Sequence, residues 1–111
     1  MDRTEYLDED QIYPTDEALE LIKAWSYKDT KGCFNFMKEI WNYQNYFNSE
    51  IDHEKMVEIY HISTIGWSGN EAIIYALQQN FMIWHTTWVQ SRRGGHYIFE
   101  RKIVDIQAES V

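Results

Sequence analysis

The stretch FMIWHTTWVQSRRGGHYIFERKIVDI (residues 81–106) gives the clearest indication of the fold of this chain. Two runs rich in β-branched and aromatic residues flank SRRGG (91–95), whose glycines allow the positive φ angles of a tight turn. Such runs are typical of strands. We therefore predict a β-hairpin whose strands fill residues 81–90 and 96–106.

The turn of this hairpin sets its register. A two-residue turn at Arg93 and Gly94 places apolar residues opposite each other on both faces of the hairpin, and we expect a sheet that is locally buried on both sides. The cross-strand pairs predicted by this register are Trp88–Phe99 and Val89–Ile98.

Two amphipathic helices are predicted near the N-terminus. PTDEALELIKAW (14–25) offers Thr15 as N-cap and acids in the first turn, so a helix is expected at about residues 15–26. DTKGCFNFMKEIWNYQNYF (29–47) begins with a capping Asp29 or Thr30 and predicts a second helix at about 30–44. The stripes that face the core are predicted to be Ala18, Leu21, Ile22 and Trp25 in the first helix, and Cys33, Met37, Ile40, Trp41 and Gln44 in the second.

The middle of the chain completes the predicted fold. NSEIDHEK (48–55) is interpreted as a polar connection, MVEIYHIS (56–63) as a strand, and SGNEAIIYALQQN as a helix at about 69–79. The order is α-α-β-α-β-β. We expect an α+β domain with a small three-stranded, mainly antiparallel sheet and three packed helices.

Composition indicates one folded domain. The 111 residues are 44% hydrophobic and 16% aromatic, which excludes disorder for most of the chain. The net charge is −8, and residues 1–20 hold eight acids and one base, which accounts for −7 of it. We predict an acidic flexible arm at 1–12, a domain at 13–105 and a frayed tail at 106–111. The acidity thus belongs to the N-terminal end and not to the whole surface, and it argues against duplex nucleic-acid binding.

The sequence shows no apolar run of the ~20 residues that a membrane-spanning helix needs. Its first residues, MDRTEYLDED, are acidic where a secretory signal is basic. We expect a cytoplasmic protein without membrane contact. The one cysteine, Cys33, fits a small apolar helix position better than a reactive site.

The stretch GWSGNEAII (66–74) allows two interpretations. Ser68 and Glu71 match the S-x-x-E capping box, in which each side chain accepts a hydrogen bond from the other residue's backbone amide. The capping box leaves Trp67 and Asn70 unexplained. Alternatively, the helix start after Gly66 presents spare backbone amides to an anion, with Trp67, Ser68, Asn70 and Glu71 as ligand-binding residues.

RRGGHY (92–97) also allows two interpretations. Arg92 and Arg93 can be solvated charges at the tip of the hairpin. With His96 and Tyr97, however, they offer more hydrogen-bond donors than a turn requires, which indicates an anion site. We predict that the two motifs meet at one end of the sheet.

WSGNE and RGGHY, preceded by the helix start YPTDE (13–17), resemble a small family of uncharacterised proteins from bacterial and phage genomes. The resemblance covers most of residues 13–100. It implies a compact cytosolic domain with the two motifs as its hallmark, encoded by a phage or mobile element, and it implies no activity.

Three functions follow as hypotheses. We favour a small non-enzymatic protein that sequesters an anionic, nucleotide-like ligand. The first alternative is an acidic inhibitor, of the immunity or anti-defence type, that blocks a basic site on a host protein. The second is a small enzyme that uses His61 or His96 with Glu71. Histidine and cysteine spacings match no metal motif, so no metal or cofactor is predicted.

Overall fold

The computed structural model describes residues 3–10 and 12–103, which form an α+β fold with four α-helices and a four-stranded antiparallel sheet. Its α-helices and strands, in chain order, are α1 (Asp16–Ala24), α2 (Thr30–Glu39), β1 (Phe47–Asp52), β2 (Val57–Ser63), α3 (Ser68–Gln79), α4 (Phe81–Thr87), β3 (Trp88–Arg92) and β4 (His96–Lys102). Short 3₁₀ turns lie at Arg3–Tyr6, Tyr27–Asp29 and Gln44–Tyr46. The fold class is as predicted, with one more strand and one more helix.

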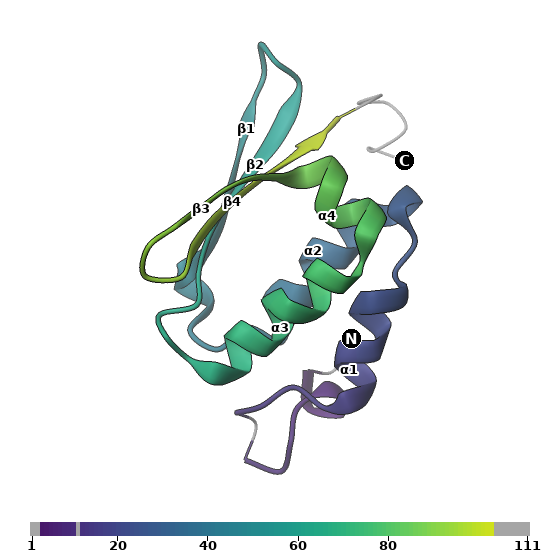
Figure 1. Cartoon of the computed structure of the whole chain (residues 1–111), viewed down its shortest axis with the longest axis vertical. Coiled ribbons are helices and arrows are strands. Elements are labelled where there is room, and N and C mark those ends of the chain that lie inside the picture. The colour runs from purple at the N-terminus through teal and green to yellow at the C-terminus, as the bar shows by residue number, and fades with distance from the viewer. Residues whose placement is uncertain (1–2, 11, 104–111) are drawn as a thin grey trace.

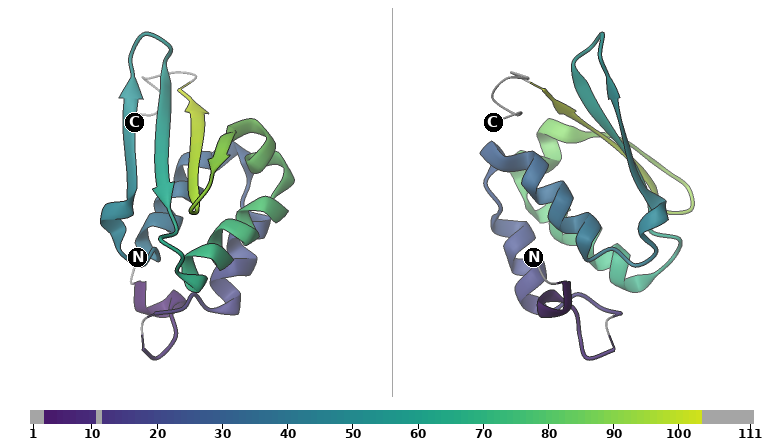
Figure 2. Two further views of the ribbon diagram at one scale, coloured as in Figure 1. Left: turned by 60° about the vertical axis from the view of Figure 1, so that its left-hand side comes forward. Right: turned by 180° about the vertical axis from the view of Figure 1, so that it is seen from behind.

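The strands lie in the order β1-β2-β4-β3, so β1 and β3 are the edges and all neighbours are antiparallel. The helices all lie on one side of this sheet, and the opposite face is bare (Figures 1 and 2). The expectation of a sheet buried on both sides was therefore wrong. We call the two sides the inner face and the outer face.

The core lies between the inner face and the helices. Phe34 of α2 stacks on Tyr60 of β2 with ring centroids 4.2 Å apart, and it also contacts Phe99 of β4. Ile73 and Leu77 of α3 are buried in the same core. Alternation along each strand sends the intervening side chains to the outer face, which explains why polar residues gather there.

The strand predicted at residues 81–90 is in fact a helix followed by a short strand. The side chain of Asn80 accepts a hydrogen bond from the amide of Ile83, which caps α4, and it also donates to the carbonyl groups of Ile22 and Trp25. Buried Ile83 and Thr87 are four residues apart, the spacing of one helix face. Only residues 88–92 are left for β3.

The β3–β4 hairpin keeps the predicted Trp88–Phe99 pair but not the predicted turn. Arg92 pairs with His96, so the loop has three residues, Arg93, Gly94 and Gly95, in place of two. A β-bulge at Val89 absorbs the extra residue, and Gln90 pairs with Ile98 where Val89 was expected.

Two further segments differ from the predictions. Phe47 and the first five residues of the stretch expected to be a polar connection form edge strand β1, which pairs with β2 from Phe47↔Ile62 to Asp52↔Val57. Helix α2 ends at Glu39, five residues earlier than expected. Ile40 and Trp41 remain in the core beyond the helix end.

The N-terminal segment packs on the domain. Leu7 is 5% exposed and belongs to the core, Tyr6 makes an edge contact with Phe36, and Leu7 forms a β-bridge with Pro14. The flexible arm predicted at residues 1–12 was expected to bury little surface, and the burial of Leu7 contradicts that expectation. The predicted tail at 106–111 lies outside the described residues.

Candidate functional site

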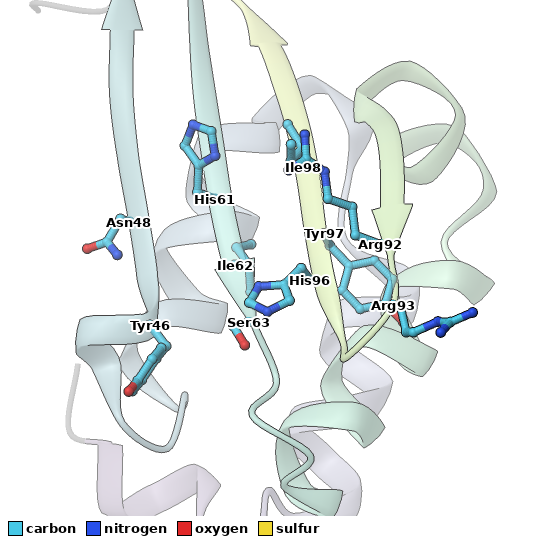
Figure 3. A pocket seen from close by; sticks show the side chains of 10 residues that line it. All are labelled: Tyr46, Asn48, His61, Ile62, Ser63, Arg92, Arg93, His96, Tyr97 and Ile98. Atoms are coloured by element: carbon cyan, nitrogen blue, oxygen red, sulfur yellow. The ribbon is translucent and has the colours of Figure 1, made fainter.

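A groove of about 380 Å³ lies on the outer face, beside the tip of the β3–β4 hairpin (Figure 3). Each of the four strands contributes to it, because it crosses the sheet from edge to edge. The lining residues are Tyr46 before β1, Asn48 of β1, His61, Ile62 and Ser63 of β2, His96, Tyr97 and Ile98 of β4, Arg92 of β3, and Arg93 in the hairpin loop.

The strand register arranges the outer-face side chains in two polar rows. Asn48 pairs with His61 and His61 pairs with Ile98, which form one row. Ser63 pairs with His96 and His96 pairs with Arg92, which form the next. Paired residues point to the same face, so the groove floor combines two imidazoles, an amide and a guanidinium around Ile98.

His61 is oriented by a carboxylate. Its Nε2 lies 3.3 Å from Oε1 of Glu50, which projects from β1 on the same face. Both side chains are at least half exposed, so the pair contributes little to stability. Its consequence is local: the carboxylate holds the imidazole ring in its orientation.

The guanidinium groups at the hairpin tip have no acidic partner among residues 3–10 and 12–103. The Nε of Arg92 donates to Oε1 of Gln90 at 3.1 Å, and none of the ion pairs in this region involves Arg92 or Arg93. Arg101, in contrast, donates to Glu58 Oε1 at 2.7 Å on the inner face. Arg92 therefore keeps donors for an external anion.

The hairpin tip is fixed to the rest of the domain. Gly94 and Gly95 have φ angles of 90° and 80°, and the carbonyl of Gly95 accepts a hydrogen bond from the amide of Thr64 at 3.0 Å. A Cβ at Gly95 would collide with Oγ1 of Thr64. This close approach requires glycine and holds Arg92 and His96 in place.

Half of the predicted ligand-binding residues line the groove, namely Arg92, Arg93, His96 and Tyr97. The ring of Tyr97 lies on the inner side, where it packs against Trp84 and Phe99, so it supports the site from behind. Figure 3 shows Arg92 lying over β4 near Ile98, whereas the side chain of Arg93 extends away from the groove. Arg92 and His96 are the members of the motif that face a ligand.

The other half, Trp67, Ser68, Asn70 and Glu71, does not line the groove. Trp67 stacks on Tyr13 with ring centroids 5.6 Å apart. Asn70 is 1% exposed and bridges the backbone of Asn42, accepting from its amide and donating to its carbonyl, both at 2.9 Å. Trp67 and Asn70 thus connect the start of α3 to Tyr13 and to the chain that follows α2.

The predicted capping box does not form. Helix α3 begins at Ser68, one residue earlier than expected, so its N-cap is Trp67, whose side chain makes no capping hydrogen bond. The hydroxyl of Ser68 donates instead to the hydroxyl of Tyr13 at 3.2 Å. Gly69 packs closely against Trp67, because a Cβ there would lie 3.0 Å from Nε1 of Trp67 and the indole would have to shift by a few tenths of an ångström. That nitrogen is buried without a hydrogen-bond partner among the described residues.

Sequence reasoning missed Tyr46 and Asn48 as groove residues, and it named His61 only for the enzyme alternative. Strand β1 had not been recognised, so nothing indicated that Tyr46 and Asn48 line a groove together with residues of the β3–β4 hairpin. The period of two in residues 57–63 could have shown His61 and Ser63 on the face opposite Tyr60 and Ile62. In the structure the carboxylate beside His61 is Glu50, not the predicted Glu71.

Other reactive residues lie apart from the groove. Cys33 is buried, and burial together with the charge of Asp29 raises the pKa of its thiol to about 12, which makes it unreactive. In the part of the chain that the structure describes, no group of three or more His, Cys, Asp and Glu side chains is placed to hold a metal ion. None of the described helices combines the length and apolar character of a membrane span.

Comparisons with protein-family models, curated proteins and solved structures give no match to this chain.

Proposed function

We propose that the outer-face groove binds an anionic, nucleotide-like small molecule through its phosphate. Arg92 supplies charge-assisted hydrogen bonds from β3, and His96 and His61 approach the same space from β4 and β2. The observation that carries the proposal is the guanidinium of Arg92, which has no acidic partner and lies beside two imidazoles in a hollow of about 380 Å³.

The remainder of the groove suits the non-ionic part of such a ligand. Tyr46 is an exposed ring at the β1 side and can stack on a base, and Asn48 offers an amide that both donates and accepts. Ile98 provides an apolar floor between them and Arg92. The proposed site thus keeps Arg92 and His96 from the predicted set and takes His61, Tyr46 and Asn48 in place of the WSGNE residues.

The test is an NMR titration of the full chain with inorganic pyrophosphate, a nucleoside 5′-monophosphate and the matching neutral nucleoside. We expect saturable shifts at Arg92, His96 and His61 with both anions, and the nucleotide should also shift Tyr46. The neutral nucleoside should bind more weakly than the nucleotide. Shifts confined to residues 67–71, or none that saturate, would contradict the proposal.

The inhibitor alternative has one structural observation in its favour. Large apolar side chains are exposed along α4 and the start of β3, with Phe81 67% exposed, and such residues are common in protein interfaces. They are Phe81, Met82, Trp88 and Val89. A partner protein whose binding is weakened by Phe81→Ser and unchanged by Arg92→Ala would favour this function over ligand binding.

A further inference from the structure

The two histidines of the groove are near neighbours on one face of the sheet. His61 pairs with Ile98 and Ser63 pairs with His96, so His61 and His96 occupy diagonal positions across β2 and β4. Diagonal neighbours on one face of antiparallel strands are about 7–8 Å apart. Both imidazoles are exposed to solvent on the outer face (Figure 3). A phosphate held between β2 and β4 at this point of the groove would lie beside both histidines.

The surroundings of the two rings differ. His61 has a carboxylate partner, Glu50, at 3.3 Å, and Glu100 of β4 projects from the same face one row further along. His96 has Arg92 as its cross-strand neighbour and no acid bonded to it among residues 3–10 and 12–103. One imidazole is therefore oriented by a carboxylate and the other stands beside a guanidinium. Such an asymmetric pair suits proton removal at one position and proton delivery at the other.

We propose that the groove cleaves single-stranded RNA by internal transphosphorylation, with His61 as general base and His96 as general acid. This inference rests on the proposed function, because the anion site is what holds the scissile phosphate. His61 removes the proton of the ribose 2′-hydroxyl as its oxygen attacks the adjacent phosphorus. The bond from phosphorus to the 5′-oxygen breaks, and His96 donates a proton to that oxygen. Arg92 stabilises the charge on the non-bridging oxygens.

The products balance the reactants without any co-reactant. One fragment ends in a 2′,3′-cyclic phosphate and the other begins with a 5′-hydroxyl, and the two histidines have exchanged protonation states. RNA fits this set of groups because it carries its own nucleophile. The one serine of the groove, Ser63, is 6% exposed, and its hydroxyl accepts a hydrogen bond from the amide of Ile65.

The shape and charge of the site favour a single strand over a duplex. The groove is an open sheet face on which an unstacked base can lie against Tyr46, as bases commonly do on aromatic side chains of RNA-binding sheets. Positive charge is concentrated at Arg92 and Arg93, whereas Glu50, Asp52 and Glu100 lie further along the same face. Only a short stretch of phosphates can be held next to the histidines.

The principal experiment incubates the full chain with a short fluorescent oligoribonucleotide in buffer containing a metal chelator. A second oligonucleotide with a single 2′-deoxyribose at the cut position serves as the uncleavable analogue. We expect cleavage of the RNA to a cyclic phosphate, binding without cleavage of the analogue, and a loss of rate of about 100-fold or more in His61→Ala and in His96→Ala. His53→Ala, which changes an exposed histidine outside the groove, is the matched control and should cut at the wild-type rate.

The roles of the two histidines can be separated with a second substrate. A nucleoside 3′-(p-nitrophenyl phosphate) has a leaving group that departs without protonation. This substrate should restore most of the rate of His96→Ala and none of the rate of His61→Ala. With the RNA substrate, kcat/KM should give a bell-shaped pH profile, since one imidazole must be neutral and the other protonated. Glu50→Gln should lower the rate of RNA cleavage, because the carboxylate that orients His61 is lost.

The outcomes distinguish the inference from the function on which it rests. If the analogue binds at Arg92 but RNA is not cut, cleavage is wrong and anion binding stands. If neither nucleic acid nor pyrophosphate binds, both proposals are wrong. Cutting at equal rates by wild type, His61→Ala and His96→Ala would also overturn the inference, since the activity would then come from elsewhere. Circular dichroism of each variant establishes that it is folded.

Discussion

The two polar motifs of this chain look alike in the sequence and differ in the structure. In WSGNE (67–71) two polar side chains bond to distant parts of the chain: buried Asn70 holds the backbone of Asn42, and the exposed hydroxyl of Ser68 bonds to Tyr13. RRGGHY (92–97) leaves the donors of Arg92 and the ring of His96 at a solvent-filled groove. A polar group whose partners are already inside the fold supports structure, and one without internal partners is available to a ligand. The contrast predicts which substitutions change stability and which change binding.

The largest effect should come from the buried motif. Asn70→Ala removes two hydrogen bonds and leaves the amide and carbonyl of Asn42 without the partners they have in the structure. We expect the free energy of unfolding of the variant to be about 3 kcal/mol lower than that of the wild type. Glu71→Ala, an exposed neighbour in the same motif, should cost about 0.5 kcal/mol through its interaction with the helix dipole. Chemical denaturation measures both, and equal effects would remove the distinction between the motifs.

The groove motif should behave in the opposite way. Arg92→Ala is expected to weaken pyrophosphate binding by about 1.5–3 kcal/mol, because a charge-assisted contact is lost. Its unfolding free energy should change by no more than about 0.5 kcal/mol, as at other exposed positions. Calorimetry gives the first quantity and denaturation the second.

Lys102→Ala is the matched control for Arg92→Ala. Lys102 is an exposed cation of β4 on the same face, paired with Val57 and outside the groove. Its removal changes the net charge by the same amount and should leave pyrophosphate binding nearly unchanged at physiological salt. If both variants lose affinity equally, the anion senses the overall charge of the sheet and not the groove.

Much of the fold was accessible from sequence, and the errors have physical causes. The strand at 57–63 and the helix at 68–79 carry their own periodic patterns, so both were predicted nearly to their ends. Strand β1 carries no such pattern: Phe47 is its one buried residue, its outward residues are polar, and its edge position gives it little apolar content. The aromatic residues of 81–87 suggest a strand, and Asn80 overrides that preference by capping a helix.

The candidate site was predictable only in part for a related reason. RRGGHY has more hydrogen-bond donors than a turn requires, and this surplus is visible in the sequence alone. His61 and Asn48 reach the groove only because β1, β2 and β4 pair in this register, and the pairing of distant strands is set by the packing of the whole inner face. WSGNE was predicted to bind a ligand because the sequence does not show whether the side-chain amide of an asparagine will bond to buried backbone or to a ligand. In the structure the amide of Asn70 bonds to backbone.

A third prediction concerns the ion pair of Glu58 and Arg101. Arg101 has an acidic partner, whereas Arg92 has none among the described residues, so the two arginines can be compared. Burial alone raises the pKa of Glu58, but hydrogen bonds from Arg101, Tyr60 and Ser49 and the charge of Arg101 outweigh it, and the pKa lies below its usual value. A carboxyl with a lowered folded-state pKa contributes stability above its unfolded-state pKa and loses it as the pH falls through the folded-state value.

We therefore expect the unfolding free energy of the wild type to fall as the medium is acidified below pH 5, and to fall less steeply in Glu58→Gln. The difference between the two proteins should be greatest near pH 7 and should shrink at low pH. Denaturant titrations at a series of pH values measure it. Parallel curves would show that Arg101 is no better paired than Arg92, which would weaken the contrast on which the groove assignment depends.

The smallest effect is expected at Ser68. A capping serine would cost about 1 kcal/mol on replacement by alanine. The structure makes Ser68 the first residue of α3 and gives its hydroxyl an exposed bond to Tyr13 at 3.2 Å, so we expect Ser68→Ala to cost no more than about 0.5 kcal/mol. Thr15→Ala provides the internal standard, because the hydroxyl oxygen of Thr15 accepts from the amide of Ala18 at 3.1 Å and caps α1. Thr15→Ala should cost about 1 kcal/mol in the same denaturation experiment. A Ser68→Ala loss as large as that of Thr15→Ala would mean that the capping box forms in solution, and the start of α3 would then have to be redrawn at Gly69.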